Sequence, residues 1–164
     1  MRLARVITPL RILLVLLFAG LLAAEALSVP GQFLHLAAEA PEAGAVPYVL
    51  LVATLLGLVA LQVVIVCVWR LLSLVRSDLI FSERAFAWVD TIAWALAAGW
   101  AVLAAASAYL VTVIYVTPAL RDPGVPILLF GVTLVGAVVV LVVVVLRALL
   151  RQAAGLRADL AGVI

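Results

Sequence analysis

The chain has 164 residues, of which 70% are hydrophobic and 11% are charged, and its mean hydropathy is +1.45. A water-soluble domain covers its apolar core with a polar surface, and ten basic and eight acidic residues are too few to form one. The composition therefore excludes soluble enzymes and disordered regulators and predicts an integral membrane protein. All ten basic residues are arginine, a bias that favours a GC-rich bacterial source.

Four segments are apolar enough to cross a bilayer, whose hydrocarbon core requires about 20 apolar residues per helix. We expect these spans over residues 10–27, 47–69, 87–116 and 125–146. An outer loop over residues 28–46 and a charged connection over residues 70–86 join them, and an interfacial tail over residues 147–164 mixes leucine with arginine. The expected fold is an all-α integral membrane protein, a single four-transmembrane-helix bundle.

The arginines are distributed unequally between the two sides of the membrane. Nine of them precede the first span, lie between the second and third, or follow the fourth, whereas the other side has only Arg121. By the positive-inside rule both termini lie in the cytoplasm, which predicts a multi-pass protein of the inner (plasma) membrane. The start of the chain also resembles a cleaved signal ending at Ala24-Glu25-Ala26, but the apolar run from Leu10 is near full spanning length and favours a retained span.

The connection before the third span is the most structured polar feature of the chain. Ser82 is placed to cap a helix that begins at Glu83, because its hydroxyl can accept a hydrogen bond from a first-turn N–H. A helix from Glu83 to Val116 is about 50 Å long at 1.5 Å per residue, so its first turns extend beyond the hydrocarbon. This predicts an exposed patch at the inner interface, whose members are the partner-docking candidates Ile80, Phe81, Ser82 and Phe86.

The same connection resembles that of the bacterial membrane proteins called domain of unknown function 2975. The resemblance is carried by Ile80-Phe81-Ser82, Ala85-Phe86, Val89-Asp90 and Ile92. It implies a four-span layout and, because members of that family are often encoded beside a small helix-turn-helix regulator, a cytoplasmic partner of that kind. It implies no established chemistry. We expect no direct contact with nucleic acid, because membrane topology already explains the arginines.

Two acidic residues are the ionisable candidates within the spans. Asp90 lies two turns into the third helix, where it either serves as a proton or ligand site or pairs with an arginine at the inner boundary. The candidate partners are Arg70, Arg76 and Arg147. Glu25 is expected near the outer end of the first span, where it either resembles the membrane glutamate of small multidrug resistance transporters or is simply solvated.

The outer loop and the tail offer further candidates. His35 and Glu39 have the i, i+4 spacing of one helix face and could bind a divalent cation together with Glu42. A surface charge cluster is the simpler interpretation, because no recognised zinc signature is present, and we expect neither a metal nor a cofactor. In the tail, the residues expected to contact lipid phosphates are Arg147, Arg151 and Arg157.

Two hypotheses of function follow from these observations. No nucleophile motif, glycine-rich phosphate loop or catalytic carboxylate pair is present, so we expect no catalytic residue and no enzyme activity. The favoured hypothesis is a non-enzymatic regulatory or scaffold protein that docks a cytoplasmic partner through the connection over residues 70–86. The alternative is a small transporter or channel that uses Asp90 and Glu25. The alanines at every fourth position from Ala93 to Ala105 favour packing within the chain and leave a homo-oligomer open.

Overall fold

The computed structural model describes residues 2–39, 41–76, 83–118 and 123–161. Within these ranges it places the side chains of residues 7–39, 41, 43–75, 85–118 and 123–156. The elements in chain order are helices α1 (Arg2–Ala23), η1 (Ala24–Ser28, a π-helical turn), α2 (Val29–Glu39), η2 (Pro41–Ala43, a 3-10 turn), α3 (Val46–Arg76), α4 (Glu83–Val116) and α5 (Gly124–Ala161).

Four helical runs are long and apolar enough to cross a membrane, as the sequence predicts. They cover Ile7–Glu39, Val46–Val75, Ala85–Val116 and Gly124–Leu156, with 30 to 33 residues each. At 1.5 Å per residue such runs are about 45–50 Å long, so they exceed the roughly 30 Å of hydrocarbon and reach the head groups on both sides. The prediction of an all-α protein with four transmembrane helices is confirmed.

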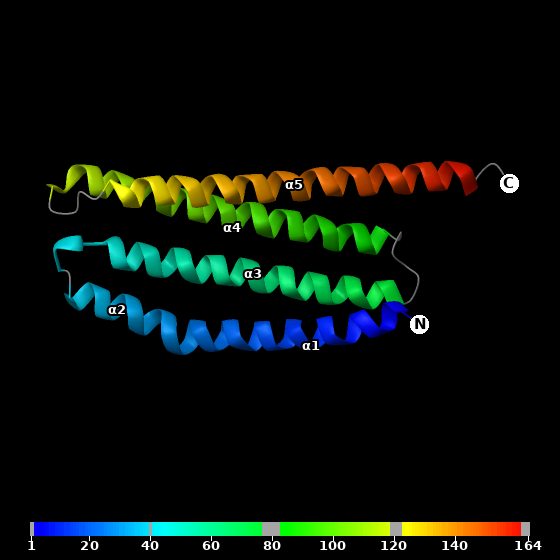
Figure 1. Cartoon of the computed structure of the whole chain (residues 1–164), viewed down its shortest axis with the longest axis horizontal. Coiled ribbons are helices and arrows are strands. Elements are labelled where there is room, and N and C mark those ends of the chain that lie inside the picture. The colour runs from blue at the N-terminus through cyan, green and yellow to red at the C-terminus, as the bar shows by residue number, and fades with distance from the viewer. Residues whose placement is uncertain (1, 40, 77–82, 119–122, 162–164) are drawn as a thin grey trace.

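The spanning helices lie in chain order across the molecule, and each packs mainly on its neighbour in the chain (Figure 1). Helices α1 and α2 pack on α3, α3 packs on α4, and α4 packs on α5. Both termini lie at the same end of the molecule, which we call the terminal end, and α5 extends beyond the other helices there. Helix α3 ends and helix α4 begins at the terminal end, whereas α2 and α4 end and α3 and α5 begin at the opposite end.

The first span is longer than the sequence suggests, because residues 29–39, expected in an outer loop, form α2. A proline inside a helix has no N–H to donate and clashes with the carbonyl four residues before it, so Pro30 opposes a regular helix at this point. The π-helical turn accommodates the proline, and the N–H of Val29 donates to the carbonyl oxygen of Ala24. The helix bends between α1 and α2 but continues through the bend (Figure 1). The helix therefore does not end at Leu27, and the outer loop expected over residues 28–46 is helical up to Glu39.

The start of α4 and the end of α5 also bear on the site. Helix α4 has the expected bounds, Glu83–Val116, so its first residues precede the apolar part of the span. Ser82, its expected cap, lies outside the described residues. Helix α5 does not stop at residue 146 but continues to Ala161, since leucine, alanine, arginine and glutamine all favour helix. Up to Ala161, the tail expected at the interface is a continuation of the helix that forms the fourth span.

Trp100 and Gly136 fit together where α4 packs on α5. The indole Nε1 of Trp100 donates a hydrogen bond to the backbone carbonyl of Thr133 on α5 at 3.0 Å. A Cβ atom added to Gly136 would lie 2.9 Å from Cδ1 of Trp100, closer than carbon atoms pack. The glycine therefore makes room for the indole, and this fit sets how α5 lies against α4.

Candidate functional site

Asp90 joins α4 to α5 near the terminal end. Its Oδ1 accepts a hydrogen bond from Arg147 Nε at 2.5 Å, and its Oδ2 accepts one from Arg151 Nη2 at 2.6 Å. Arg147 and Arg151 are one turn apart on α5, so they share a helix face and can converge on a single carboxylate. The side chains of Asp90 and Arg147 are 26% and 29% exposed, whereas that of Arg151 is 54% exposed. The less hydrated pair with Arg147 is therefore the stronger of the two.

The sequence left two interpretations of Asp90 open, and the structure places this residue in an arginine pair. Arg147 was among the predicted partners, but Arg151 was assigned only to lipid contacts. The spacing of Arg147 and Arg151 by four residues could have predicted that both pair with Asp90. Two cations four residues apart lie on one helix face, so both can contact one acidic residue on a neighbouring helix. The contacts of both arginines with lipid phosphates stay predictions, and the side chain of Arg157 lies outside the described ones.

Two more arginines link neighbouring helices at the same end. Arg11 of α1 donates from Nη2 to the hydroxyl oxygen of Ser73 of α3 at 2.9 Å, and its guanidinium carbon lies 5.3 Å from the centre of the Trp69 ring. Arg70 of α3 lies over the Trp88 ring of α4, with its guanidinium carbon 5.9 Å from the ring centre. Both arrangements are within the range in which a cation is attracted to an aromatic face.

These contacts connect the spanning helices one after another. Arg11 links α1 to α3, Arg70 links α3 to α4, and Asp90 links α4 to α5. We call this series the terminal clamp and define it by the five charged residues Arg11, Arg70, Asp90, Arg147 and Arg151. Because each link joins adjacent helices at the level where the spans approach the head groups, the terminal clamp fixes the relative positions of the helix ends around the α3–α4 connection.

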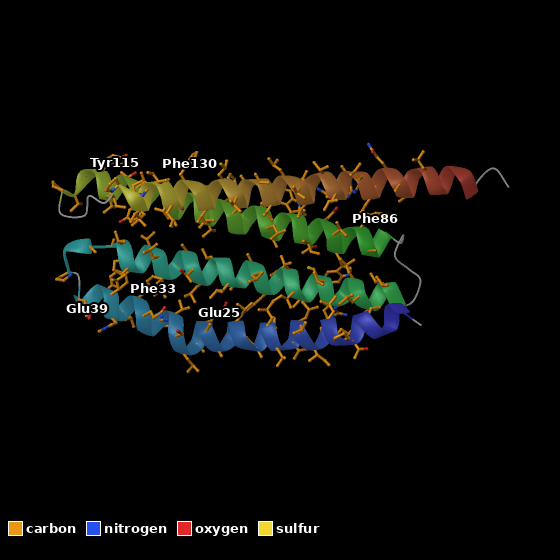
Figure 2. The ribbon with its side chains drawn as sticks, viewed as in Figure 1. Glu25, Phe33, Glu39, Phe86, Tyr115 and Phe130 are labelled. Atoms are coloured by element: carbon orange, nitrogen blue, oxygen red, sulfur yellow. The ribbon has the colours of Figure 1, made fainter. Side chains whose placement is uncertain are left out.

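Phe86 is the docking candidate that the structure describes. It is half-buried and lies on α4 one turn before Asp90, at the terminal end (Figure 2). Ile80, Phe81 and Ser82 lie outside the described residues, so nothing in the structure bears on their arrangement. The side chains of Arg76 and Arg84, at the ends of the same connection, are likewise outside the described ones.

Glu25 lies in the π-helical turn and faces α3 (Figure 2). Its Oε2 accepts a hydrogen bond from Nε2 of Gln62 at 2.9 Å. Its other oxygen, Oε1, is buried and has no hydrogen-bond partner among the described residues. Gln62 is near the middle of the 31-residue helix α3, so the two side chains meet about halfway along this spanning helix. The helical run does not end soon after Glu25, as the sequence suggests, but continues through α2 as far as Glu39.

The environment of Glu25 is chemically unusual for a spanning helix. A polar atom that is buried without a hydrogen bond costs about 1–3 kcal/mol, and an acidic residue at the centre of a bilayer costs about 2.5–3.5 kcal/mol on insertion scales. Single π-helical turns occur often at functional sites, because they change the direction of one side chain within a helix. The free oxygen of Glu25 is therefore placed to accept a proton or a cation.

His35 and Glu39 form an exposed pair on α2 at the opposite end. The Nε2 atom of His35 lies 3.1 Å from a carboxylate oxygen of Glu39, and the two side chains are 72% and 65% exposed. The side chain of Glu42 lies outside the described ones. Among the described residues, no three histidine, cysteine, aspartate or glutamate side chains gather closely enough to hold a metal ion.

The fold and these polar links define a multi-pass α-helical membrane protein with four spanning helices. The chain belongs to the DUF2975 family, since the family model described as Protein of unknown function (DUF2975) matches residues 31–164. This match confirms the resemblance carried by the connection and the start of α4. No curated protein and no solved structure matches the chain.

Proposed function

We propose that this protein is a non-enzymatic regulatory or scaffold protein of the cell membrane, which docks a cytoplasmic protein through the connection over residues 70–86. The observation that carries the proposal is the double pairing of Asp90 with Arg147 and Arg151, which holds the first turns of α4 against α5. A surface next to a fixed helix start is pre-organised, so a partner loses less conformational entropy when it binds there.

Phe86 supplies the described anchor of this surface. Its ring is half-buried and lies one turn from Asp90. The pairing of Asp90 with Arg147, which holds this part of α4 in place, therefore also fixes the position of Phe86. Aromatic side chains are enriched at protein interfaces, where a few of them account for most of the binding energy. Phe81 lies close by in the sequence and is the second expected anchor.

The charges near the connection favour a partner with an acidic rim. Within residues 70–86, three arginines (Arg70, Arg76 and Arg84) outnumber two acidic residues (Asp78 and Glu83). Complementary charge speeds association and selects the correct partner. The positive-inside rule places this end in the cytoplasm. A small helix-turn-helix regulator is the partner that the family resemblance implies, and its retention at the membrane would make this protein a regulator of transcription without direct contact with DNA.

Co-purification tests the proposal. In detergent extracts of cells that carry both proteins, Phe81→Asp and Phe86→Asp should each lower recovery of the regulator by roughly tenfold or more, because a buried charge replaces an aromatic anchor. Phe33→Asp on α2 is the matched control, since Phe33 lies at the opposite end (Figure 2). Gel filtration of each variant reports whether it is folded. Unchanged recovery with folded Phe81→Asp and Phe86→Asp would contradict docking at this surface.

A second candidate function, a small proton- or cation-coupled transporter, is favoured by one observation at Glu25. Its Oε1 atom is buried near the middle of α3 without a hydrogen-bond partner among the described residues, where a transported proton or cation would find an acceptor. Asp90 is the weaker site for this role, since two arginines already bind its carboxylate.

Proteoliposomes distinguish this candidate from the first. If the protein transports, a pH or cation gradient should produce flux that Glu25→Gln abolishes and that Gln32→Glu, a charge change on the exposed face of α2, leaves unchanged. Asp90→Asn should alter stability more than flux. Absence of flux from the wild-type protein, or equal flux from Glu25→Gln, would exclude transport through this site.

A further inference from the structure

A groove of about 460 Å³ runs between α1 and α3 and adjoins the docking surface proposed above, with which it shares Arg70 and Ser73. On one side it is lined by α1 from Leu14 to Leu22, and on the other by Ile65 and Val66 of α3. Eight residues of helix rise by about 12 Å, so the groove is long and parallel to the spans. These walls are apolar, and the groove lies at the depth of the lipid tails next to the terminal end.

The rim of the groove at the terminal end is polar and positively charged. It is lined there by Trp69, Arg70 and Ser73. Arg11 reaches this rim from α1, because its Nη2 atom donates to the hydroxyl oxygen of Ser73. No acidic residue lies among the described residues that line the groove. An apolar slot with two arginines at its head-group end therefore matches an amphiphile with a long apolar chain and an anionic head.

Arg11 has a buried hydrogen-bond donor that an anion could satisfy. Its Nε atom is buried and has no hydrogen-bond partner among the described residues. A buried donor without an acceptor is unfavourable, and a small rotation of the long side chain would bring Nε and Nη2 to the same acceptor group. A planar guanidinium offers two such parallel donors to the oxygens of a phosphate.

We propose that this groove binds one anionic phospholipid of the leaflet at the terminal end. One acyl chain lies between α1 and α3, and the lipid phosphate accepts hydrogen bonds from Arg11 and Arg70. The indole of Trp69 lies at the boundary between the two parts of the lipid, where tryptophan is enriched in membrane proteins. The bound lipid fills the space between α1 and α3 next to Arg11, the first residue of the terminal clamp.

Native mass spectrometry of the purified full chain in detergent tests the head-group part of the proposal. Phosphatidylglycerol should bind more tightly than phosphatidylcholine with the same acyl chains, and Arg11→Gln and Arg70→Gln should each weaken phosphatidylglycerol binding roughly fivefold. Arg121→Gln, which removes the same charge from the α4–α5 connection, is the matched control and should have no effect. Equal affinity for the two lipids, or unchanged binding by both arginine variants, would overturn the proposal.

The acyl-chain part is tested with the arginines intact. Ala19 lines the groove, so Ala19→Phe should fill it and weaken binding of both lipids, whereas Leu13→Phe, at a 62% exposed position outside the groove, should not. Glycerol phosphate, which has the head-group chemistry without acyl chains, should not bind measurably. Binding of glycerol phosphate as tight as that of the lipid would identify a free-phosphate site and contradict the lipid. Arg70 is exposed, so Arg70→Gln remains informative if Arg11→Gln does not fold.

Discussion

Asp90 and Arg147, 57 residues apart in the chain, form a hydrogen-bonded ion pair of 2.5 Å that joins the start of α4 to α5. Arg151 binds the second oxygen of the same carboxylate at 2.6 Å. This relationship explains how an acidic residue is tolerated two turns into a spanning helix, since both of its oxygens have cationic donors. It also fixes the helix start that carries Phe86.

Asp90→Ala should lower the free energy of unfolding by about 1–3 kcal/mol, because it leaves the partly buried guanidinium of Arg147 and the exposed one of Arg151 without their carboxylate. Thr91→Ala is the control, since the hydroxyl of Thr91 bonds to the backbone oxygen of Ala87 in its own helix. Denaturation in detergent micelles gives both values. In double-mutant cycles, Arg147→Gln should show a larger coupling to Asp90 than Arg151→Gln, because Arg147 is less exposed. Equal coupling would contradict this ranking.

Gln62→Leu should destabilise the protein by about 1–3 kcal/mol, because it removes the donor from the half-satisfied carboxylate of Glu25. Gln32→Leu makes the same change on the exposed face of α2 and should have little effect. The double variant Glu25→Leu with Gln62→Leu should regain most of the lost stability, since no buried polar group is then left alone. A double variant less stable than Gln62→Leu would show that this pair does not stabilise the protein through its hydrogen bond.

Gly136→Ala should destabilise the packing of α4 on α5 by about 1–3 kcal/mol, because its methyl group would collide with the ring of Trp100. Gly131→Ala provides a control on the same helix, where an added Cβ meets no atom within 4 Å. Unfolding in detergent and Trp100 fluorescence report stability and local packing respectively. If the two variants behaved alike, the close fit of Trp100 over Gly136 would be wrong.

Topology fusions in a bacterial host test which side of the membrane the terminal end occupies. A fluorescent protein fused after residue 164 should fluoresce and alkaline phosphatase fused there should be inactive, because nine of ten arginines predict a cytoplasmic terminal end. Alkaline phosphatase fused after Gly44, in the connection between α2 and α3, should be active. The reverse pattern would place the proposed docking surface outside the cytoplasm.

Span number could be predicted from the sequence because hydrophobic length is a property of local composition. Helix continuity at Pro30 could not, since it depends on the π-helical turn that accommodates the proline. This single difference places Glu25 within a continuous helical run, opposite Gln62 near the middle of α3, and not at the end of a helix. The chemistry available to Glu25 therefore became clear only from the structure.

The partners of Asp90 could be predicted in part. Helices α4 and α5 are antiparallel, with 26 residues from Asp90 to the end of α4 and 23 residues from the start of α5 to Arg147, so similar depths follow from the sequence. The rotation of each helix about its axis does not follow, because it depends on packing such as that of Trp100 over Gly136. That rotation brings Arg151 to the same carboxylate.

Site-specific photocrosslinking in native membranes tests whether the connection and the start of α4 dock a cytoplasmic protein. Photoreactive residues would replace Phe81 and Phe86, with Phe33 at the opposite end as the control, and mass spectrometry would identify the captured molecules. Positions 81 and 86 should capture the same cytoplasmic protein, whereas position 33 should not. Capture of only lipid or a second copy of this chain from positions 81 and 86 would contradict this docking.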